Sequence, residues 1–261
     1  MSKKITQAVI LSAGFGTRLK PLTDTMPKVM IPFFGKPLLE HHIEQYKKFG
    51  VTEFFINLHY LPEVITNYFG DGSKWGVSIT YANENPILGT AGGMKNFTPS
   101  APSTGLVQAS SGHGGKLKGD FYLIYGDVFS QVDYGKMAEA YYQTPEGRIG
   151  MELIGETDHP KDSDLAVVDE QLKFLKIYQK PHQEIPPKYV SMRGVYIFNE
   201  KILAYIPAHT YYEIDHALLP DILEKGEAFY GYQCDDFLKD VGTMERYQFV
   251  TEYLRKHFKF S

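Results

Sequence analysis

The sequence has little cysteine, no long apolar run and no large excess of either charge. Its 261 residues include a single cysteine, Cys234, which excludes an internal disulfide and a metal site built from several cysteines. The net charge of −4 provides no global positive field for nucleic acid. No apolar run approaches the roughly 20 residues that a membrane helix needs. With 43% apolar and 22% charged residues, the composition predicts a globular, cytoplasmic protein without nucleic-acid or membrane partners.

Several familiar motifs are absent as well. There is no G-x-S-x-G nucleophile elbow and no H-E-x-x-H metal motif, and no hexapeptide repeat that would build a β-helix. The N-terminal stretch MSKKITQAVILSAG resembles a signal peptide only at first glance, because its apolar core of about six residues is too short. We interpret residues 8–11 as a buried strand instead.

Short apolar runs alternate with helical periodicity in the first half of the chain. This alternation predicts βαβ units around a mainly parallel sheet, in which ligands bind beyond the carboxyl ends of the strands. The expected strands are residues 8–11, 53–58, 77–82 and 121–127, and the expected helices are residues 36–50 and 63–69.

The second half is richer in strands, and their close spacing predicts an antiparallel layer. The expected strands are residues 148–155, 164–169, 171–178 and 189–198, with helices at 213–226 and 243–258. No linker separates the halves, so we expect one mixed domain with two lobes, about 1–135 and about 136–261. Residues 98–119 are rich in Ser, Gly, Pro and Thr and predict a surface loop, in which SSGHGGK is a weak candidate phosphate cradle.

The stretch LSAGFGTRLKPLTDTMPK combines bare backbone with cations directly after the first strand. It lacks the third glycine of a dinucleotide fingerprint, because Leu19 stands there, and it lacks Walker A spacing. Gly14 and Gly16 still allow the backbone to approach anionic oxygens. Arg18 adds a planar fork suited to phosphate, and Lys28 is a second cation. A tight turn with a surface arginine remains the alternative.

The blocks L-S-A-G-x-G-T-R-L-x-P-L-T, P-K and G-K-P-L-L-E resemble the opening of the sugar-1-phosphate nucleotidyltransferases, the nucleotide-diphosphosugar pyrophosphorylases. The resemblance runs in order from Leu11 to Tyr247 and is nearest to the mannose-1-phosphate and heptose-1-phosphate guanylyltransferases. Further blocks that carry it are residues 86–93, 125–128, 180–181, 193–198, 239–243 and 245–247. It implies a Rossmann-like, GT-A-like fold with a nucleotide-binding lobe and a smaller, strand-rich sugar-binding lobe.

The resemblance also implies a reaction of a nucleoside triphosphate with a sugar 1-phosphate, together with residues for each part of the site. The attacking phosphate is already ionised, so no protein nucleophile is needed. The implied catalytic residues are Arg18, Lys28, Asp127 and Asp240, of which Asp127 and Asp240 hold Mg²⁺, the expected cofactor. The implied nucleotide-binding residues are Leu11, Ala13, Gly14, Gly16, Thr17, Glu84, Gly89, Thr90 and Gly126. The implied sugar-phosphate-binding residues are Gln179, Lys180 and Gly194.

Glu84 decides the expected base. It is a pure acceptor, and guanine offers two adjacent donors, N1–H and the 2-amino group, so GTP is favoured over UTP or dTTP. Uridylyl or thymidylyl transfer stays an alternative, because uracil N3–H can also donate. Ordinary roles stay open too: a surface acid for Glu84, a surface lysine for Lys180 and loop capping for Asp127.

The sugar-reading positions depart from the family pattern. Gln179 replaces an acid, Met192 replaces an asparagine, and Leu165-Ala166 replaces Tyr-Gly. These differences leave the identity of the sugar open. Mannose 1-phosphate and a manno-heptose 1-phosphate are the first candidates, because the resemblance favours the guanylyltransferases. The altered pocket also keeps open a catalytically silent relative that binds nucleotide sugars as a regulator. A homo-oligomer is compatible with the sequence but is not indicated by it.

Overall fold

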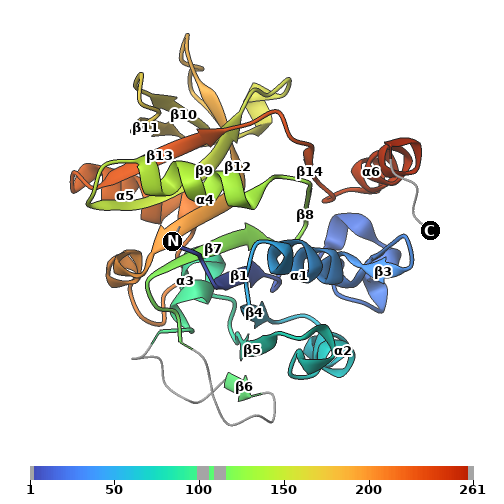
Figure 1. Cartoon of the computed structure of the whole chain (residues 1–261). Helices are drawn as coiled ribbons and strands as arrows, with labels where there is room; N and C mark the ends of the chain where they lie inside the picture. Colours follow the sequence, from blue (N-terminus) through green and yellow to red (C-terminus); the bar gives the residue numbers. More distant parts are fainter. Residues whose placement is uncertain (1–2, 99–105, 109–115, 258–261) are drawn as a thin grey trace.

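The computed structural model describes residues 3–98, 106–108 and 116–257, and ten strands form its largest sheet. These strands are β1 (Gln7–Leu11), β4 (Glu53–Leu58), β5 (Ser78–Asn83), β6 (Leu106–Gln108), β7 (Asp120–Tyr125), β9 (Arg148–Gly155), β10 (Leu165–Val168), β11 (Phe174–Tyr178), β12 (Val190–Asn199) and β13 (Ala228–Gln233). Their order is β11-β10-β12-β7-β1-β4-β5-β6, and β9 joins β12 and β13 (Figure 1).

The described helices are α1 (Leu38–Lys48), α2 (Pro62–Phe69), α3 (Gly89–Lys95), α4 (Tyr134–Gln143), α5 (Leu219–Glu224) and α6 (Met244–His257). The helices α1, α2 and α4 cover one face of the sheet, and α3 and α5 cover the other. In β1, Ala8 and Ile10 belong to the core shared with α1, α2 and α4. Val9 belongs to the core shared with α3 and α5. The run AVIL is apolar throughout because this strand is buried on both faces. The predicted α/β fold, a mixed and mainly parallel sheet flanked by helices, is confirmed.

The central strands place the site. β1 pairs in parallel with β4 on one side and with β7 on the other, and β4 pairs in parallel with β5. The chain therefore runs from β1 outward to one side and later returns to fill the other. The crevice at such a switch point, beyond the carboxyl ends of the strands, is where α/β sheets bind ligands. The segments that follow β1 and β7 open into this crevice.

The second half extends the same sheet with antiparallel strands. β12 runs antiparallel to β7, β9 and β10, whereas β13 is parallel to β9. The register of β12 against β9 shifts between Met192 and Tyr196, and Gly194 within this bulge has a φ of 69°. A β-carbon added at Gly194 would lie 2.8 Å from the Tyr125 ring. Glycine is therefore required where β12 turns towards the crevice.

Three segments differ from the sequence-based expectation. Residues 106–108 of the predicted loop pair antiparallel with β5 as β6; residues 99–105 and 109–115, which include most of SSGHGGK, lie outside the described residues. Residues 86–93, read as a turn, contain the start of α3. The helix expected at 213–226 begins with a π-helical turn, Ile214–Leu218, before α5. Phe258, the expected end of the last helix, is not among the described residues.

The last helix packs far from its neighbours in sequence. Val250 and Leu254 of α6 share a buried cluster with Leu19, Ile31 and Phe33, which belong to the loops after β1. Two short strands, β8 (Val128–Ser130) and β14 (Leu238–Asp240), pair antiparallel beneath this helix. α6 is thereby fixed against the segment that follows β1, and in Figure 1 it lies beyond β14. Within the described ranges, no helix is both long and apolar enough to cross a bilayer.

We predict that Gly126→Ala destabilises the protein, whereas Gly14→Ala does not. A β-carbon at Gly126 would lie 2.6 Å from the Leu11 carbonyl oxygen and 2.7 Å from Val29 Cγ1, but at Gly14 nothing lies within 4 Å. Overpacking of this kind costs about 1–3 kcal/mol. Denaturant unfolding of both variants measures the difference, and equal unfolding midpoints would contradict the close packing of β7 against β1.

Candidate active site

Two adjoining cavities lie in the crevice. The larger has a volume of about 870 Å³ and the smaller about 260 Å³. Tyr125 and Asp127, which follow one another closely at the end of β7, line both. The two spaces therefore meet at a single strand end.

The smaller cavity gathers most of the residues that the resemblance assigns to the nucleotide. A chain of hydrogen bonds forms its wall. The Ser12 amide donates to Asn57 Oδ1 at 2.6 Å, and Asn57 Nδ2 donates to Glu84 Oε1 at 2.8 Å. The Leu88 amide donates to Glu84 Oε2 at 2.9 Å. The assigned residues on this wall are Leu11, Ala13, Gly14, Lys28, Glu84, Gly89, Thr90 and Asp127.

Glu84 thus links the loop after β1 to the segment before α3. Its side chain is 3% exposed, and burial raises its pKa, an effect that the Leu88 amide and Asn57 oppose. Each carboxylate oxygen has two lone pairs, of which one is used inside the protein. Glu84 therefore holds two loops in place and retains acceptor capacity for a ligand.

The N-terminus of α3 is hydrogen-bonded to the backbone of a segment from the second half of the chain. The amides of Ala91 and Gly92 donate to the Tyr212 carbonyl at 2.9 and 3.0 Å. Gly89 has a φ of 77°, and a β-carbon there would lie 2.7 Å from the same oxygen. Thr90 Oγ1 accepts from the Ile214 amide at 2.8 Å. The glycines of PILGTAGG thus permit a close approach of two backbones.

Five charged side chains meet between the two cavities. Lys28 Nζ contacts Asp127 Oδ2, and Arg246 Nη1 contacts both oxygens of Asp240 at 2.6 and 2.7 Å. A β-carbon built at Gly242 would lie 2.9 Å from Asp240 Oδ1, 3.1 Å from Arg18 Nη2 and 3.5 Å from Lys28 Nζ. Glycine therefore leaves open a small space on which a carboxylate and two cations converge.

The strand pairing explains why the two aspartates come together. Asp240 lies opposite Val128 in the β8–β14 pair, and the Val241 amide donates to the Asp127 carbonyl at 2.8 Å. Among the described residues, no group of three or more His, Cys, Asp and Glu side chains is placed to hold a metal. Two carboxylates that face a ligand cavity fit Mg²⁺, which takes its remaining ligands from phosphate and water. They do not fit a metal that needs an all-protein cage.

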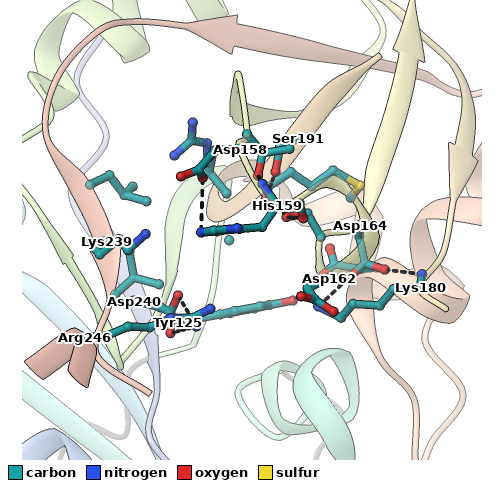
Figure 2. A pocket seen from close by; sticks show the side chains of 18 of the residues that line it. Tyr125, Asp158, His159, Asp162, Asp164, Lys180, Ser191, Lys239, Asp240 and Arg246 are labelled. Carbon is teal, nitrogen blue, oxygen red and sulfur yellow. Dashed lines mark hydrogen bonds and ion pairs between the residues drawn. The ribbon is translucent and has the colours of Figure 1, made fainter. Parts of the chain in front are cut away.

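The larger cavity has its own polar cluster opposite Asp240 and Arg246. Asp164 contacts Lys180 Nζ at 3.2 Å and His216 Nε2 at 2.9 Å, and accepts from the Lys180 amide at 3.0 Å. Figure 2 shows Asp164 and Lys180 on one side of the pocket and Asp240 and Arg246 on the other, with Tyr125 between them. Lys180 is therefore presented to the cavity by a carboxylate partner.

A buried acidic cluster lies behind Tyr125. Tyr125 Oη and Tyr196 Oη donate to the two oxygens of Asp215 at 2.6 and 2.5 Å. Glu152 Oε1 accepts from the amides of Arg193 and Gly194 at 3.0 and 3.2 Å, and among the described residues its Oε2 has no hydrogen-bond partner. Burial, then the Asp215 charge, raises the Glu152 pKa well above its usual 4.5. Burial also raises the pKa of Asp215.

Not every residue assigned from the sequence reaches a cavity wall. Arg18, Lys180, Gly194 and Asp240 line the larger cavity, but Gly16, Thr17, Gly126 and Gln179 are absent from both linings. Gln179 instead donates to the His216 carbonyl at 2.9 Å. Gly16 lies close to Lys28 and Thr23, and Gly126 lies against β1, so both support the site from behind.

Other residues of the site were not assigned from the sequence. They are Asn57, Tyr125, Asp164, Tyr211, Asp215 and Arg246. Asn57 and Tyr125 carried a usable signal, because each is a polar side chain at the carboxyl end of a predicted parallel strand. Arg246 and Asp215 lie in helical segments whose approach to the crevice depends on tertiary packing.

Comparisons with known proteins give one consistent answer. A family model described as nucleotidyl transferase matches residues 7–257. The UTP–glucose-1-phosphate uridylyltransferase of Synechocystis sp. is 31% identical over 92% of this chain and 61% of its own length. The mannose-1-phosphate guanylyltransferase of Mycobacterium tuberculosis is 29% identical over 94% of this chain and 63% of its own length. The chain therefore spans about three fifths of the length of these relatives.

A solved structure agrees in fold. That of a UDP-glucose pyrophosphorylase complexed with UDP-glucose has a TM-score of 0.74 and 20% identity, and covers 97% of this chain and 100% of its own. At this identity the likeness shows the fold alone. The resemblance noted in the sequence is confirmed by the family model.

The raised pKa of Glu152 predicts a pH-dependent effect of Glu152→Gln. A folded pKa above 4.5 means that the acid contributes stability when protonated, and that this stability is lost as the pH rises through the raised pKa. The amide does not titrate, so the unfolding free energy of the variant should fall less with rising pH. The difference approaches about 1.4 kcal/mol for each unit by which the folded pKa exceeds the unfolded one.

Denaturant unfolding from acidic to alkaline pH measures this difference, with exposed Glu170→Gln as the control. Parallel pH profiles for the wild type and Glu152→Gln would show that folding does not raise the pKa of Glu152.

Proposed function

Because the chain belongs to the nucleotidyl transferase family, we propose that it joins a nucleoside triphosphate to a sugar 1-phosphate. An oxygen of the sugar phosphate forms the new bond to the α-phosphorus. The oxygen that bridges the α- and β-phosphorus leaves with pyrophosphate, and a nucleotide-diphosphate sugar remains. The sugar phosphate is ionised near neutral pH, so this transfer needs positioning and charge stabilisation rather than a protein base.

The convergence at Gly242 carries the proposal. The smaller cavity, lined by glycine backbone and Glu84, takes the nucleoside, and the larger one takes the sugar phosphate beside Lys180. Arg18 and Lys28 lie where the two cavities join and neutralise the triphosphate and the leaving pyrophosphate. Asp127 and Asp240 hold Mg²⁺, which supplies charge stabilisation at the phosphate oxygens.

GTP is the proposed nucleotide. Glu84 is an acceptor-only side chain at the wall of the smaller cavity, and its free lone pairs suit the N1–H and 2-amino donors of guanine. A relative at 29% identity is a mannose-1-phosphate guanylyltransferase, which favours mannose 1-phosphate or a manno-heptose 1-phosphate as the partner. A relative at 31% identity is a uridylyltransferase, so UTP with another sugar 1-phosphate is the competing outcome. Pyrophosphate release across a panel of nucleotides and sugar 1-phosphates decides between them.

Asp127→Asn and Asp240→Asn should each remove most turnover without unfolding the protein. Loss of one metal carboxylate costs transition-state stabilisation, and we expect a rate lower by on the order of 10²-fold. Pyrophosphate release at saturating Mg²⁺ measures the effect. Asp71→Asn, in the turn after α2, is the matched control. A near-wild-type rate in either site variant would remove that residue from the metal site.

The base is tested first on the unaltered protein. If Glu84 accepts from both guanine donors, GTP should be preferred over ITP, which lacks the 2-amino group. An unpaired buried acceptor costs about 1–3 kcal/mol, or roughly 5- to 150-fold in kcat/KM. Competition assays with GTP, ITP, UTP and dTTP measure the ranking. Equal use of GTP and ITP would show that the 2-amino group is not read.

Glu84→Gln then separates base reading from loop positioning. The amide has only one acceptor oxygen, so it cannot serve both Asn57 and the Leu88 amide. A role in base reading predicts a changed ranking, with UTP or dTTP improved relative to GTP. A role in loop positioning alone predicts a uniform loss for every nucleotide, as in the control Asn57→Ala.

A further inference from the structure

Each carboxylate of the proposed metal pair, Asp127 and Asp240, already forms an ion pair with a basic side chain. The Arg246–Asp240 contact is the more complete one, because Arg246 Nη1 faces both oxygens and the Gly242 amide also donates to Oδ1 at 3.1 Å. Lys28 Nζ contacts Asp127 through one carboxylate oxygen. A metal ion would bind through the same carboxylate lone pairs that these two cations occupy. Metal binding at Asp240 therefore competes with Arg246.

The Arg246–Asp240 ion pair can open because it is exposed to solvent. Its two side chains are 34% and 36% exposed, and a solvent-accessible ion pair is only weakly favourable. Arg246 lies on the first turns of α6, whose Val250 and Leu254 are anchored in the buried cluster. The side chain can therefore turn away from Asp240 while its helix stays in place.

The position of Arg246 also places its guanidinium group where phosphate oxygens could bind it. It lines the larger cavity together with Arg18 and Lys180, and Figure 2 shows Arg246 and Lys180 on opposite sides of this cavity. A guanidinium freed from Asp240 has several donors for phosphate oxygens in a fork geometry. An incoming polyanion stabilises the released arginine, and a metal ion stabilises the released carboxylate.

We propose that Arg246 is a positioning residue that occupies Asp240 until metal and triphosphate arrive together, and then transfers to the phosphates. This inference rests on the proposed function, because it needs Asp240 to be a metal ligand. The Arg246–Asp240 ion pair would make metal binding weak in the absence of nucleotide and cooperative in the presence of nucleotide. By linkage, the nucleotide gains the same factor from the metal.

The test is Mn²⁺ binding followed by electron paramagnetic resonance, with and without a non-hydrolysable GTP analogue. Arg246→Met keeps the length of the side chain and removes its charge. Without nucleotide, it should bind Mn²⁺ tighter than the wild type by on the order of fivefold. With the GTP analogue bound, Arg246→Met should bind Mn²⁺ no more tightly than the wild type, because the triphosphate then lacks the Arg246 guanidinium as a partner. Arg255→Met, an exposed arginine on the same helix, should match the wild type in both conditions.

Arg246→Lys provides a second variant of conserved charge. Its point charge should hold Asp240 less completely, so its Mn²⁺ affinity should lie between those of the wild type and Arg246→Met. Equal Mn²⁺ affinity of all three proteins without nucleotide would overturn the inference. Asp240→Asn distinguishes failure of the Arg246 inference from failure of the proposed function. Undiminished Mn²⁺ binding by this variant with nucleotide would overturn the proposed metal pair itself.

Discussion

The hydrogen bond from the Val241 amide to the Asp127 carbonyl, at 2.8 Å, is the contact on which the site depends. It continues the β8–β14 pairing and brings the backbone of two aspartates from distant parts of the chain together. β8 follows directly from the central strand β7, so the first aspartate is fixed by the core of the sheet. The second is carried by β14 and held by α6, which packs against the loops after β1. The packing of α6 therefore helps to hold the second aspartate in the site.

The charges of this site balance before any ligand arrives. Lys28 is paired with Asp127 and Arg246 with Asp240, so the pairs present little net field of their own. Two polyanionic substrates shift this balance strongly towards negative charge. In the proposed mechanism, a divalent cation together with the released arginine would offset this excess, and joint binding of metal and triphosphate would be more favourable than binding of either alone.

The sequence predicted local features well and long-range contacts poorly. Residues 8–11 and 121–127 identified the strand ends because buried parallel strands read as apolar runs, and the glycines of SAGFG marked a turn with exposed backbone. α3 was missed because its glycine-rich sequence favours turns, and it is held by contacts with Tyr212 from the second half. Gln179 was assigned from its place beside Lys180, but its side chain turns to the His216 carbonyl. Such choices depend on tertiary neighbours rather than on spacing, and the roles of the assigned residues stay predictions.

The wall of the smaller cavity shows why base preference is hard to assign to one residue. Glu84 is tied through Asn57 to the Ser12 amide, which begins the glycine loop, and through the Leu88 amide to the start of α3. A β-carbon at Gly93 would lie 2.4 Å from Glu84 Oε1, so the helix itself leaves room for the carboxylate. A change at Glu84 is therefore expected to disturb the glycine loop and the start of α3 together. If Glu84 reads the base as proposed, it does so only from the position in which this hydrogen-bonded wall holds it.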